Sequence, residues 1–474
     1  MSEEVKNLVL DLDGTLLRTD SLWELVSLAF VNGHILSLFW IVFGRAALKR
    51  RLSQVSLPVL SLLPWNEEVV RLAREAEANG IQVWLATAAD EILARMVVGH
   101  FGFFSGALAS DGHTNLKGQV KAEALAARFG AKLFDYCGDS YADLPVWKVC
   151  REALVVNAPP RLLARLELVN PRLRRLGRVA SENPGRLETW SRAIRLKQWL
   201  KNVLVAVPLL LAHQFTWPAL QAVLAAFFLF SLCASALYLL NDIFDLAADR
   251  CHPVKRKRPL ASGALSVPWA LLGAGILLLL SFFGSLHLAP GFTAVLACYG
   301  LLTLAYFFIF KKMIVADNVC LGLLYTLRLI AGAAALQISM STWLLTFSFS
   351  IFIGLSFVKR LLEIRRGPPA GETDLPGRGY RFSEGRIIET MSVSSGFTAV
   401  IILALYIESA QALRLYSSPQ ILWAICPIIL YWYCRLLVLV GRGEVDYDPV
   451  IFVSRDRISI FCGLISLALI FGAM

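Results

Sequence analysis

The stretch LVLDLDGTLL at residues 8–17 is an apolar run that contains two aspartates and a glycine. This pattern is typical of a buried strand, and in a parallel sheet the side chains at the carboxyl end of such a strand line the edge where ligands bind. Two further strand-like segments, IQVWLATAAD and FDYCGDSYAD, begin at residues 81 and 134. Because a helical pattern lies between them, the sequence predicts an open α/β sheet with polar side chains gathered at one edge.

Aspartates at these strand ends form a candidate site for phosphate chemistry. Asp11 and Asp13 follow the first strand, and Asp139 and Asp143 follow the third. Several converging carboxylates repel one another unless a cation lies among them, and Mg²⁺ suits a set of oxygen ligands. Phosphoryl transfer also needs a nucleophile, a proton donor and positive charge near the phosphate oxygens. On the residues alone, the alternative that these acids only cap helices and strands stays open.

This constellation resembles the haloacid dehalogenase (HAD) superfamily of phosphatases, whose four motifs occur in the correct order across residues 7–157. The resemblance implies that Asp11 is the nucleophile that forms an aspartyl-phosphate and that Asp13 is the general acid and base. The implied ligands of a magnesium ion are Asp11, Asp13, Asp139 and Asp143. A degenerate, inactive HAD domain is the competing interpretation.

The same resemblance implies a threonine and a lysine that hold the phosphate. Thr87 stands at the end of the second strand, and the helical segment KGQVKAEALAARFG offers Lys117 and Lys121. We expect Lys121 to be the phosphate-binding lysine because it begins the helix proper, and Lys117 is the alternative.

Residues 16–80 are expected to form a helical cap that closes over this site and excludes water. The cap contains LVSLAFVNGHILSLFWIVFGRAALKRR, an apolar stretch with a basic end that Asn32, Gly33 and His34 interrupt. Two interpretations stay open for this stretch: a buried helical hairpin, or a segment that rests in the membrane interface and receives a lipid-linked substrate.

The composition excludes a chain that is soluble throughout. Of 474 residues, 57% are hydrophobic and only 17% are charged, whereas soluble domains are about one quarter charged. Residues 203–240 and 263–310 contain no Asp, Glu, Lys or Arg. A membrane-spanning helix needs about 20 apolar residues, so each of these blocks has room for two spans.

We therefore expect an all-α polytopic membrane domain of about nine transmembrane helices after the α/β domain. The spans are expected at residues 203–219, 222–240, 266–286, 291–310, 316–336, 342–358, 388–407, 419–437 and 458–474. The expected domains are residues 1–160 for the HAD-like domain, 161–191 for a basic linker along anionic headgroups, and 192–474 for the membrane domain.

Lysines and arginines crowd one set of the predicted loops, at residues 241–265, 311–315, 359–387 and 438–457. In the opposite connections Arg414 is the one basic residue. Because positive loops resist translocation, we expect an integral protein of the cytoplasmic (inner) membrane with its N-terminal domain in the cytoplasm. These loops also account for the net charge of +11, so no nucleic-acid partner is expected.

The segment YLLNDIFDLAADRCHPVKRKRPLASG at residues 238–263 is the most informative part of the membrane domain. Asn241, Asp245 and Asp249 recur every four residues, so on a continuing helix they stack along one face. Acids at bilayer depth cost about 2.5 to 3.5 kcal/mol each, which favours a watery rim or a function. Such a ladder suits Mg²⁺ that holds a diphosphate. The basic run at residues 255–258 either contacts phosphate or only anchors the loop.

NDxxDxxxD followed by RPLASG resembles the UbiA superfamily of intramembrane prenyltransferases, whose nine-helix fold matches the expected span count. Members of that superfamily carry a second DxxxD motif, but residues 290–474 contain none and offer Asp317, Arg328 and SFVKRLLEIRR instead. Replacing an acidic pair by Lys359 and Arg360 is expected to turn a site for a magnesium diphosphate into one for a bare phosphate.

With this departure, the membrane domain looks like the polyprenyl-phosphate phosphoribosyltransferases, typified by the decaprenyl-phosphate enzyme. The motifs that carry this resemblance are HPVKRKRPLASG, RLKQWLKNVLV, LLYTLRLIAGAAA and KRLLE. The resemblance implies that Mg²⁺ and the Asp motif bind the diphosphate of phosphoribosyl pyrophosphate (PRPP), and that a polyprenyl phosphate attacks ribose C1. The implied metal-binding residues are Asn241, Asp245 and Asp249. The implied substrate-binding residues are Gln198, Lys201, Asn202, Lys255, Arg258, Arg328, Lys359, Arg360 and Tyr380.

Two of these assignments have structural alternatives. Arg328 lies deep in its expected span, where an arginine is either functional or paired with a buried acid or carbonyl. Arg378 and Tyr380 either cover the site or belong to a simple loop.

With both sites expected on the cytoplasmic side, the sequence predicts a bifunctional enzyme that uses Mg²⁺ in both domains. It would transfer 5-phosphoribose from PRPP to a polyprenyl phosphate and then dephosphorylate the product, which tethering keeps at high effective concentration. The product, polyprenyl-phosphate ribose, would serve as a precursor of arabinose or ribose donors for cell-envelope glycans. One alternative is an aromatic polyprenyltransferase with a phosphatase of unrelated substrate, and another is a transporter with a regulatory HAD domain. Homo-oligomerisation is left open.

Overall fold

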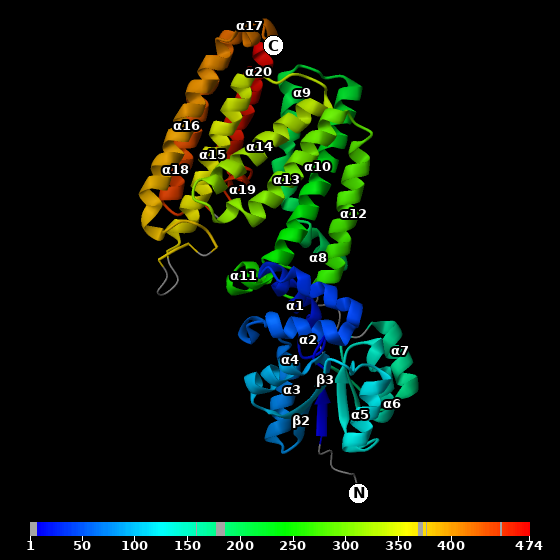
Figure 1. Cartoon of the computed structure of the whole chain (residues 1–474). Coiled ribbons are helices and arrows are strands. Elements are labelled where there is room, and N and C mark those ends of the chain that lie inside the picture. The colour runs from blue at the N-terminus through cyan, green and yellow to red at the C-terminus, as the bar shows by residue number, and fades with distance from the viewer. Residues whose placement is uncertain (1–6, 158, 177–184, 368–372, 376, 446–447) are drawn as a thin grey trace. The chain divides into compact units, whose positions relative to one another are not determined.

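The computed structural model describes residues 7–157, 159–176, 185–367, 373–375, 377–445 and 448–474 (Figure 1). The chain forms two compact units. The N-terminal unit consists of Met1–Ala193 together with Leu239–Leu272, and the helical unit consists of Ile194–Tyr238 and Gly273–Met474. The segment that carries the Asp motif therefore belongs to the unit that contains the HAD-like domain.

The N-terminal unit is built on a six-stranded parallel sheet with the order β3-β2-β1-β4-β5-β6. The strands are β1 Asn7–Leu10, β2 Gln82–Asp90, β3 Phe104–Ser110, β4 Asp135–Gly138, β5 Ala153–Val156 and β6 Leu173–Leu176. The order reverses beside β1, and in open α/β sheets ligands bind at such a reversal. The predicted α/β sheet is confirmed, and its central strands are apolar on both faces because hydrophobic clusters cover each side.

Helices connect the strands and cover the sheet. They are α3 Glu67–Ala78, α4 Glu91–Phe101, α5 Gln119–Phe129, η3 Tyr141–Asp143, α6 Leu144–Val149 and α7 Pro160–Val169. The predicted linker at residues 161–191 contains structured elements, since α7 and β6 lie within it or begin at its edge. β6 pairs in parallel with β5 through Leu173 and Ala153, and its two arginines face solvent, as suits an edge strand. Residues 177–184 of the linker lie outside the described residues.

The cap lies between β1 and α3. It consists of α1 Ser21–Val31, η1 Ile35–Phe43, α2 Arg45–Val55 and η2 Leu60–Leu62. The chain returns to the sheet where Trp65 pairs with Leu17, and α3 then packs Val69 and Ala73 into the sheet's core. The cap is therefore shorter than residues 16–80, because α3 belongs to the α/β layer.

Three short elements and parts of two long helices also belong to the N-terminal unit. The short elements of the Asp-motif segment are α11 Leu246–Cys251 and η5 Lys255–Lys257, and α8 Arg186–Ala193 precedes the helical unit. The long helix α10 Trp217–Phe244 contributes its last residues to the N-terminal unit, and the long helix α12 Val267–Ser285 contributes its first.

Seven stretches of helix among the described residues are long and apolar enough to cross a membrane. They are α10, α12 Val267–Ser285, α13 Pro290–Phe308, α14 Ala316–Ala335, α15 Thr342–Arg365, and the stretches Phe382–Ile407 and Pro419–Gly441. The last two contain η7 Phe382–Glu384 with α16 Gly385–Ile407, and η8 Pro419–Ala424 with α18 Ile425–Gly441. The remaining elements are η4 Leu196–Ala206, α9 Val207–Leu211, η6 Phe310–Lys312, α17 Ala410–Leu415, α19 Pro449–Val453 and α20 Arg457–Ala473.

An all-α domain of apolar helices is confirmed, but a count of nine spans is not. The first expected span is divided into η4 and the short α9, which carries Pro208 in its first turn. The last, α20, has 17 residues and is one of the shorter apolar helices. Hydropathy reports only that these segments are apolar, whereas the backbone geometry decides how far each one reaches.

Candidate active sites

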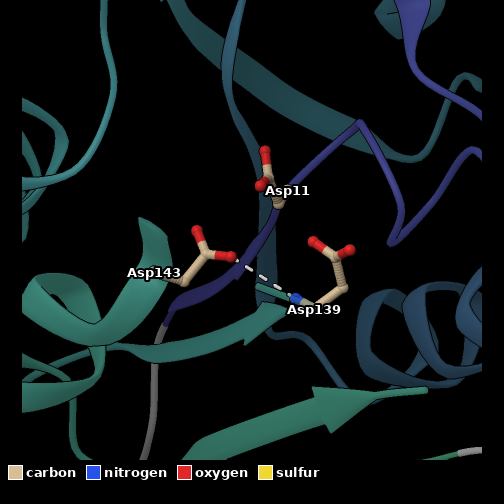
Figure 2. A group of neighbouring side chains, drawn as sticks. All are labelled: Asp11, Asp139 and Asp143. Atoms are coloured by element: carbon tan, nitrogen blue, oxygen red, sulfur yellow. Dashed lines mark hydrogen bonds between the residues drawn. The ribbon is translucent and has the colours of Figure 1, made fainter. Parts of the chain in front are cut away.

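Three carboxylates meet at the edge of the sheet, and Figure 2 shows how their side chains converge. Asp11 follows β1, Asp139 follows β4, and Asp143 ends η3. One oxygen of each lies within 4.8 Å of the others, close enough to share a cation. The residues that the structure describes contain no second group of this kind. The parallel register explains the meeting, because Leu10 pairs with Cys137 and carries Asp11 to the end of β4.

Lys121 is the cation that faces these acids. Its Nζ lies 3.0 Å from Oδ1 of Asp11 and 3.7 Å from Oδ1 of Asp143. The hydroxyl of Tyr136, which the sequence reasoning missed, accepts a hydrogen bond from Lys121 and donates one of 2.7 Å to Asp143. Lys117 is exposed. The structure thus brings Lys121, and not Lys117, to the acids.

The electrostatics of this cluster call for additional positive charge. Burial, together with Asp143 and Asp13, raises the pKa of Asp11 to about 7 although Lys121 lowers it. Burial and the neighbouring acids raise the pKa of Asp139 to about 8. Three carboxylates share one lysine, so a hard cation with oxygen ligands fits this donor set. The site also requires a glycine, because a Cβ on Gly14 would lie 2.1 Å from Oδ2 of Asp139.

Asp13 and Thr87 stand near this edge but not in the carboxylate group. Oδ1 of Asp13 accepts a 2.7 Å hydrogen bond from the backbone N–H of Ser21, which ties the motif loop to the cap. Burial and Asp20 raise the pKa of Asp13 to about 6. Thr87 is fully buried, and its Oγ1 accepts a hydrogen bond from the N–H of Ala89.

A cap residue that sequence reasoning missed also approaches the site. Lys49 on α2 is buried and donates a hydrogen bond of 2.5 Å to the carbonyl of Ala88. Burial lowers its pKa, while Asp13 and Asp20 raise it. Lys49 belongs to the basic end of the apolar cap stretch, which is evident in the sequence. The sequence pattern could not show that the side chain of Lys49 points toward the site.

The Asp-motif segment does not continue as one helix. α10 ends at Phe244, and Asp245 is the N-cap of the separate helix α11. Four-residue spacing survives because the N–H groups of Asp245 and Asp249 donate to the carbonyls of Asn241 and Asp245, each at 2.8 Å. The predicted continuous helix is therefore wrong, although the three side chains remain one turn apart.

Arg258 neutralises two acids of this segment. Its Nη1 lies 2.5 Å from Oδ2 of Asp249 and 3.1 Å from Oδ1 of Asp242. Asp242 is buried and was not among the predicted site residues. Lys255 is exposed, whereas Asn241 and Asp245 are half-buried.

The cap packs directly on the Asp-motif segment within the N-terminal unit. Glu24 of α1 receives two 2.7 Å hydrogen bonds from Arg250, and both side chains are buried. Thr19 donates to the same carboxylate, and Nε of Arg250 donates to the carbonyl of Ala261. A Cβ on Gly263 would lie 3.1 Å from Cγ2 of Thr19, so the segment closely approaches the chain that enters the cap.

In the helical unit, several predicted substrate-binding residues lie together on η4 and its neighbours. Nε of Arg328 donates a 2.9 Å hydrogen bond to Asn202. Arg328 also donates a hydrogen bond to the carbonyl of Leu324. The alternative in which this arginine pairs with a buried carbonyl therefore describes part of its environment. Lys201 forms an ion pair of 2.5 Å with Asp448. Gln198 is half-buried on the same element.

Lys359 acts on the same acid as Lys201. Burial alone would raise the pKa of Asp448, but Lys201 and Lys359 hold it at about 2. Asp448 lies far from both lysines in the sequence and was missed. The helical unit therefore gathers two cations around one carboxylate.

Arg360 lies in a buried polar network. Its guanidinium is fully buried, and Nη2 lies 2.5 Å from Oδ2 of Asp317. It also pairs with Glu363. Tyr380 donates a 2.7 Å hydrogen bond to Oδ1 of Asp317, and Arg378 donates one of 2.8 Å to Tyr306. The loop residues Arg378 and Tyr380 are thus held by packed contacts.

Comparison with known protein families matches both parts of the chain. A model of the haloacid dehalogenase-like hydrolases matches residues 8–148, and a model of the UbiA prenyltransferase family matches residues 202–370. The first match covers strands β1 to β4 with the acidic cluster, and the second covers the segment that carries the Asp motif.

Three relatives are similar over most of their own length. The uncharacterized protein y4nM of Sinorhizobium fredii is 33% identical over 461 residues, which are 96% of this chain and 89% of that protein. The nodulation protein NoeC of Azorhizobium caulinodans is 35% identical over 60% of this chain and 92% of its own. A decaprenyl-phosphate phosphoribosyltransferase of Mycolicibacterium smegmatis is 31% identical over 56% of this chain and 86% of its own.

The chain belongs to the UbiA prenyltransferase family and carries an N-terminal haloacid dehalogenase-like hydrolase domain. It is an enzyme of that family, and its apolar helices indicate an integral membrane protein. The two resemblances inferred from the sequence motifs are thereby confirmed.

Proposed function

We propose that the chain transfers 5-phosphoribose from PRPP to a polyprenyl phosphate and then removes the 5-phosphate to give polyprenyl-phosphate ribose. The observation that carries the coupling of the two steps is the buried pair between Glu24 of the cap and Arg250 beside Asp249. The transferase step is supported by the phosphoribosyltransferase relative, whose alignment covers most of that protein.

For the transferase step, Asn241, Asp245 and Asp249 would hold Mg²⁺, which would neutralise charge on the leaving pyrophosphate. Arg258 would exchange its carboxylate partners for a phosphate oxygen of PRPP, because it stands beside Asp249 and is partly exposed. The lipid phosphate oxygen attacks ribose C1 as pyrophosphate departs from the opposite face. No general base is needed because the attacking phosphate is already anionic.

Other predicted side chains would position the two substrates. Binding or guiding PRPP is assigned to Gln198, Lys201, Asn202, Lys255 and Arg328. Binding of the lipid phosphate is assigned to Lys359, Arg360 and Tyr380. Among the latter, Lys359 is half-buried, whereas Arg360 already pairs with Asp317. We therefore assign the direct phosphate contact to Lys359 and a supporting role to Arg360 and Tyr380.

For the phosphatase step, Asp11 attacks the phosphorus of the 5-phosphate, and the ribose 5-oxygen leaves with a proton from Asp13. Water then attacks the phosphoaspartate, gives its proton to Asp13 and releases phosphate. Lys121 and Thr87 would bind the phosphate oxygens, and Lys121 already contacts Asp11. Mg²⁺ held by Asp11, Asp139 and Asp143, with Asp13 nearby, would offset the charge between nucleophile and phosphate.

Both sites would face the cytoplasm from the cytoplasmic membrane. The distribution of lysines and arginines along the chain supports this orientation. A phosphorylated lipid released by the transferase would then meet the hydrolase without leaving the membrane.

The test supplies reconstituted protein with Mg²⁺, labelled PRPP and polyprenyl phosphate. Wild type is expected to form polyprenyl-phosphate ribose, whereas Asp11→Asn should accumulate the 5-phosphorylated lipid. Asp111→Asn is the matched control, because Asp111 is an exposed carboxylate of the same domain.

Each contrary outcome identifies the step that fails. Accumulation of the phosphorylated lipid by wild type would refute the coupled function while leaving the transferase intact. Absence of labelled lipid in every sample, together with turnover of a prenyl diphosphate and an aromatic acceptor, would favour the aromatic prenyltransferase instead.

A further inference from the structure

The cap carries a concentrated apolar surface, which we call the η1 patch: Leu36, Phe39, Trp40, Ile41, Val42 and Phe43. These side chains are between 43% and 79% exposed. Ser37 is buried, and Leu38 packs against the apolar core, so η1 is anchored on one side and bare on the other. The buried-hairpin interpretation of this stretch therefore does not hold for η1, although α1 and α2 on either side bury Leu25 and Leu52 in the core.

Such a patch is unusual for a domain in water. Elsewhere in the α/β layer, large exposed apolar side chains are separated along the chain, as at Met96, Val120, Leu133 and Leu168. Contiguous exposed apolar surfaces mark sites that contact another body. Two of the six patch residues are phenylalanine and one is tryptophan, and tryptophan in particular is enriched where a protein meets the membrane interface.

Basic residues adjoin the patch. Arg45 lies two residues after Phe43 and is exposed. The guanidinium of Arg51 lies 5.8 Å from the centre of the Trp40 ring. An apolar surface edged by cations is complementary to a bilayer that contains anionic lipids.

The contacts of α1 place the start of η1 near the end of a membrane-spanning helix. Phe30 stacks on Phe244 with ring centroids 4.7 Å apart, and Ser27 donates a hydrogen bond to the carbonyl of Ile243. Phe244 is the last residue of α10, whose 28 residues exceed the roughly 20 that a bilayer core requires. The end of α10 is thus expected at headgroup depth.

The short connection keeps η1 close to that depth. The element η1 begins at Ile35, five residues after Phe30, and five residues span at most about 18 Å. All of these residues belong to the N-terminal unit. A bilayer surface is therefore within reach of the patch.

We infer that the η1 patch inserts into the interfacial region of the same bilayer that the helical unit spans, with its basic neighbours on anionic headgroups. A second copy of the chain is the competing occupant. The inference concerns contact with lipid and does not depend on which phosphate the hydrolase removes.

The experiment measures the depth of a fluorescent label in the full-length protein in nanodiscs that contain anionic lipid. Val42→Cys carries the label, and Leu168→Cys carries it in the control, since both side chains are well exposed. The exposed native thiols of Cys251 and Cys298 are first replaced by serine. Quenchers are a nitroxide on the lipid chain and iodide in the water.

The label at position 42 should be quenched by the lipid nitroxide, as expected for insertion about 5–10 Å into the interface. The label at position 168 should be quenched by iodide. Removing anionic lipid, or introducing Arg45→Glu, should weaken the lipid quenching, because each basic residue near an anionic surface strengthens association about fivefold.

Iodide quenching at both positions would overturn the inference. A second outcome would also overturn the inference: the lipid nitroxide does not quench the label in discs with one chain, and protection from iodide appears only in discs with two chains. That result would assign the patch to a contact with a second copy of the chain. Because the readout is the position of a label, failure here is distinguishable from failure of the proposed enzymatic function.

Discussion

Two buried clusters of charge in this chain differ in their balance. In the N-terminal unit, Asp11, Asp139 and Asp143 face one lysine, and burial with mutual repulsion raises the pKa of Asp11 to about 7 and that of Asp139 to about 8. In the helical unit, Asp317 is paired with Arg360 and also accepts a hydrogen bond from Tyr380. The first cluster lacks positive charge and the second is supplied with it. A surplus of negative charge indicates a site that binds a cation. A network in which each acid is paired with a cation indicates a role in stabilising the fold.

The strongest contrast concerns Asp11. Asp11→Asn removes the nucleophile, so hydrolysis of a soluble phosphate monoester should fall by about 10³-fold or more. The transferase reaction should be unaffected, because no residue of the Asp motif changes. The measurement is phosphate release compared with PRPP consumption in the same preparation. A variant that keeps its hydrolase activity would show that the unbalanced cluster is not the hydrolytic site.

The matched network should respond in stability. Asp317→Ala leaves Arg360 buried without its main partner, which costs about 3–5 kcal/mol in a buried pair. Thermal unfolding in detergent should show a clear drop in the midpoint, and Asp317→Leu combined with Arg360→Met should restore most of it. A single variant that unfolds like wild type but no longer consumes PRPP would instead assign this network to substrate binding.

Magnesium should stabilise the unbalanced cluster in a pH-dependent way. The pKa values of Asp11 and Asp139 are raised in the folded state, so their contribution to stability is present at low pH and is lost as pH rises through about 7 to 8. A bound cation replaces the lost protons and adds about 2.7 kcal/mol at a hundredfold excess over its dissociation constant. Removing Mg²⁺ should therefore lower the unfolding midpoint more at about pH 8.5 than at about pH 6. Equal shifts at both pH values would contradict the assigned ligands.

The last contrast separates the two candidate lysines, and the smallest effect is expected at Lys117. Lys117→Ala changes an exposed side chain, so stability should stay within about 0.5 kcal/mol of wild type and phosphatase activity should be retained. Lys121→Met removes a donor from the phosphate site and should lower phosphatase kcat by about 10²- to 10³-fold. The reverse ranking would return the assignment to Lys117.

Local pattern was sufficient for the sheet and for the residues at its edge. Apolar runs followed by acids predicted where Asp11, Asp139 and Asp143 would meet, because parallel strands end at the same edge. The start of a helix was enough to favour Lys121. The Asp motif, in contrast, suggested an unbroken helix, since spacing alone cannot reveal that one helix ends at Phe244 and a second begins after Asp245.

Contacts between distant segments could not be predicted in this way. Glu24 and Arg250 are 226 residues apart, and Lys201 and Asp448 are 247 residues apart. Neither pair leaves a periodic signal in the sequence, because each is formed only after the helices and loops have packed. The same limit applies to span length, where hydropathy did not detect the division between η4 and α9.

The discontinuous make-up of the N-terminal unit constrains how the gene could be divided. A fragment that stopped after Ala193 would lose Leu239–Leu272, so Glu24 would lack Arg250 and Phe30 would lack Phe244. Gene fission at the linker would therefore release a hydrolase domain that lacks these packing partners and exposes the surface they cover. Such a domain is expected to aggregate or to be degraded. A stable hydrolase domain expressed alone would need a grafted copy of residues 239–272. If the two domains were separated in evolution, other residues would have to replace the same contacts.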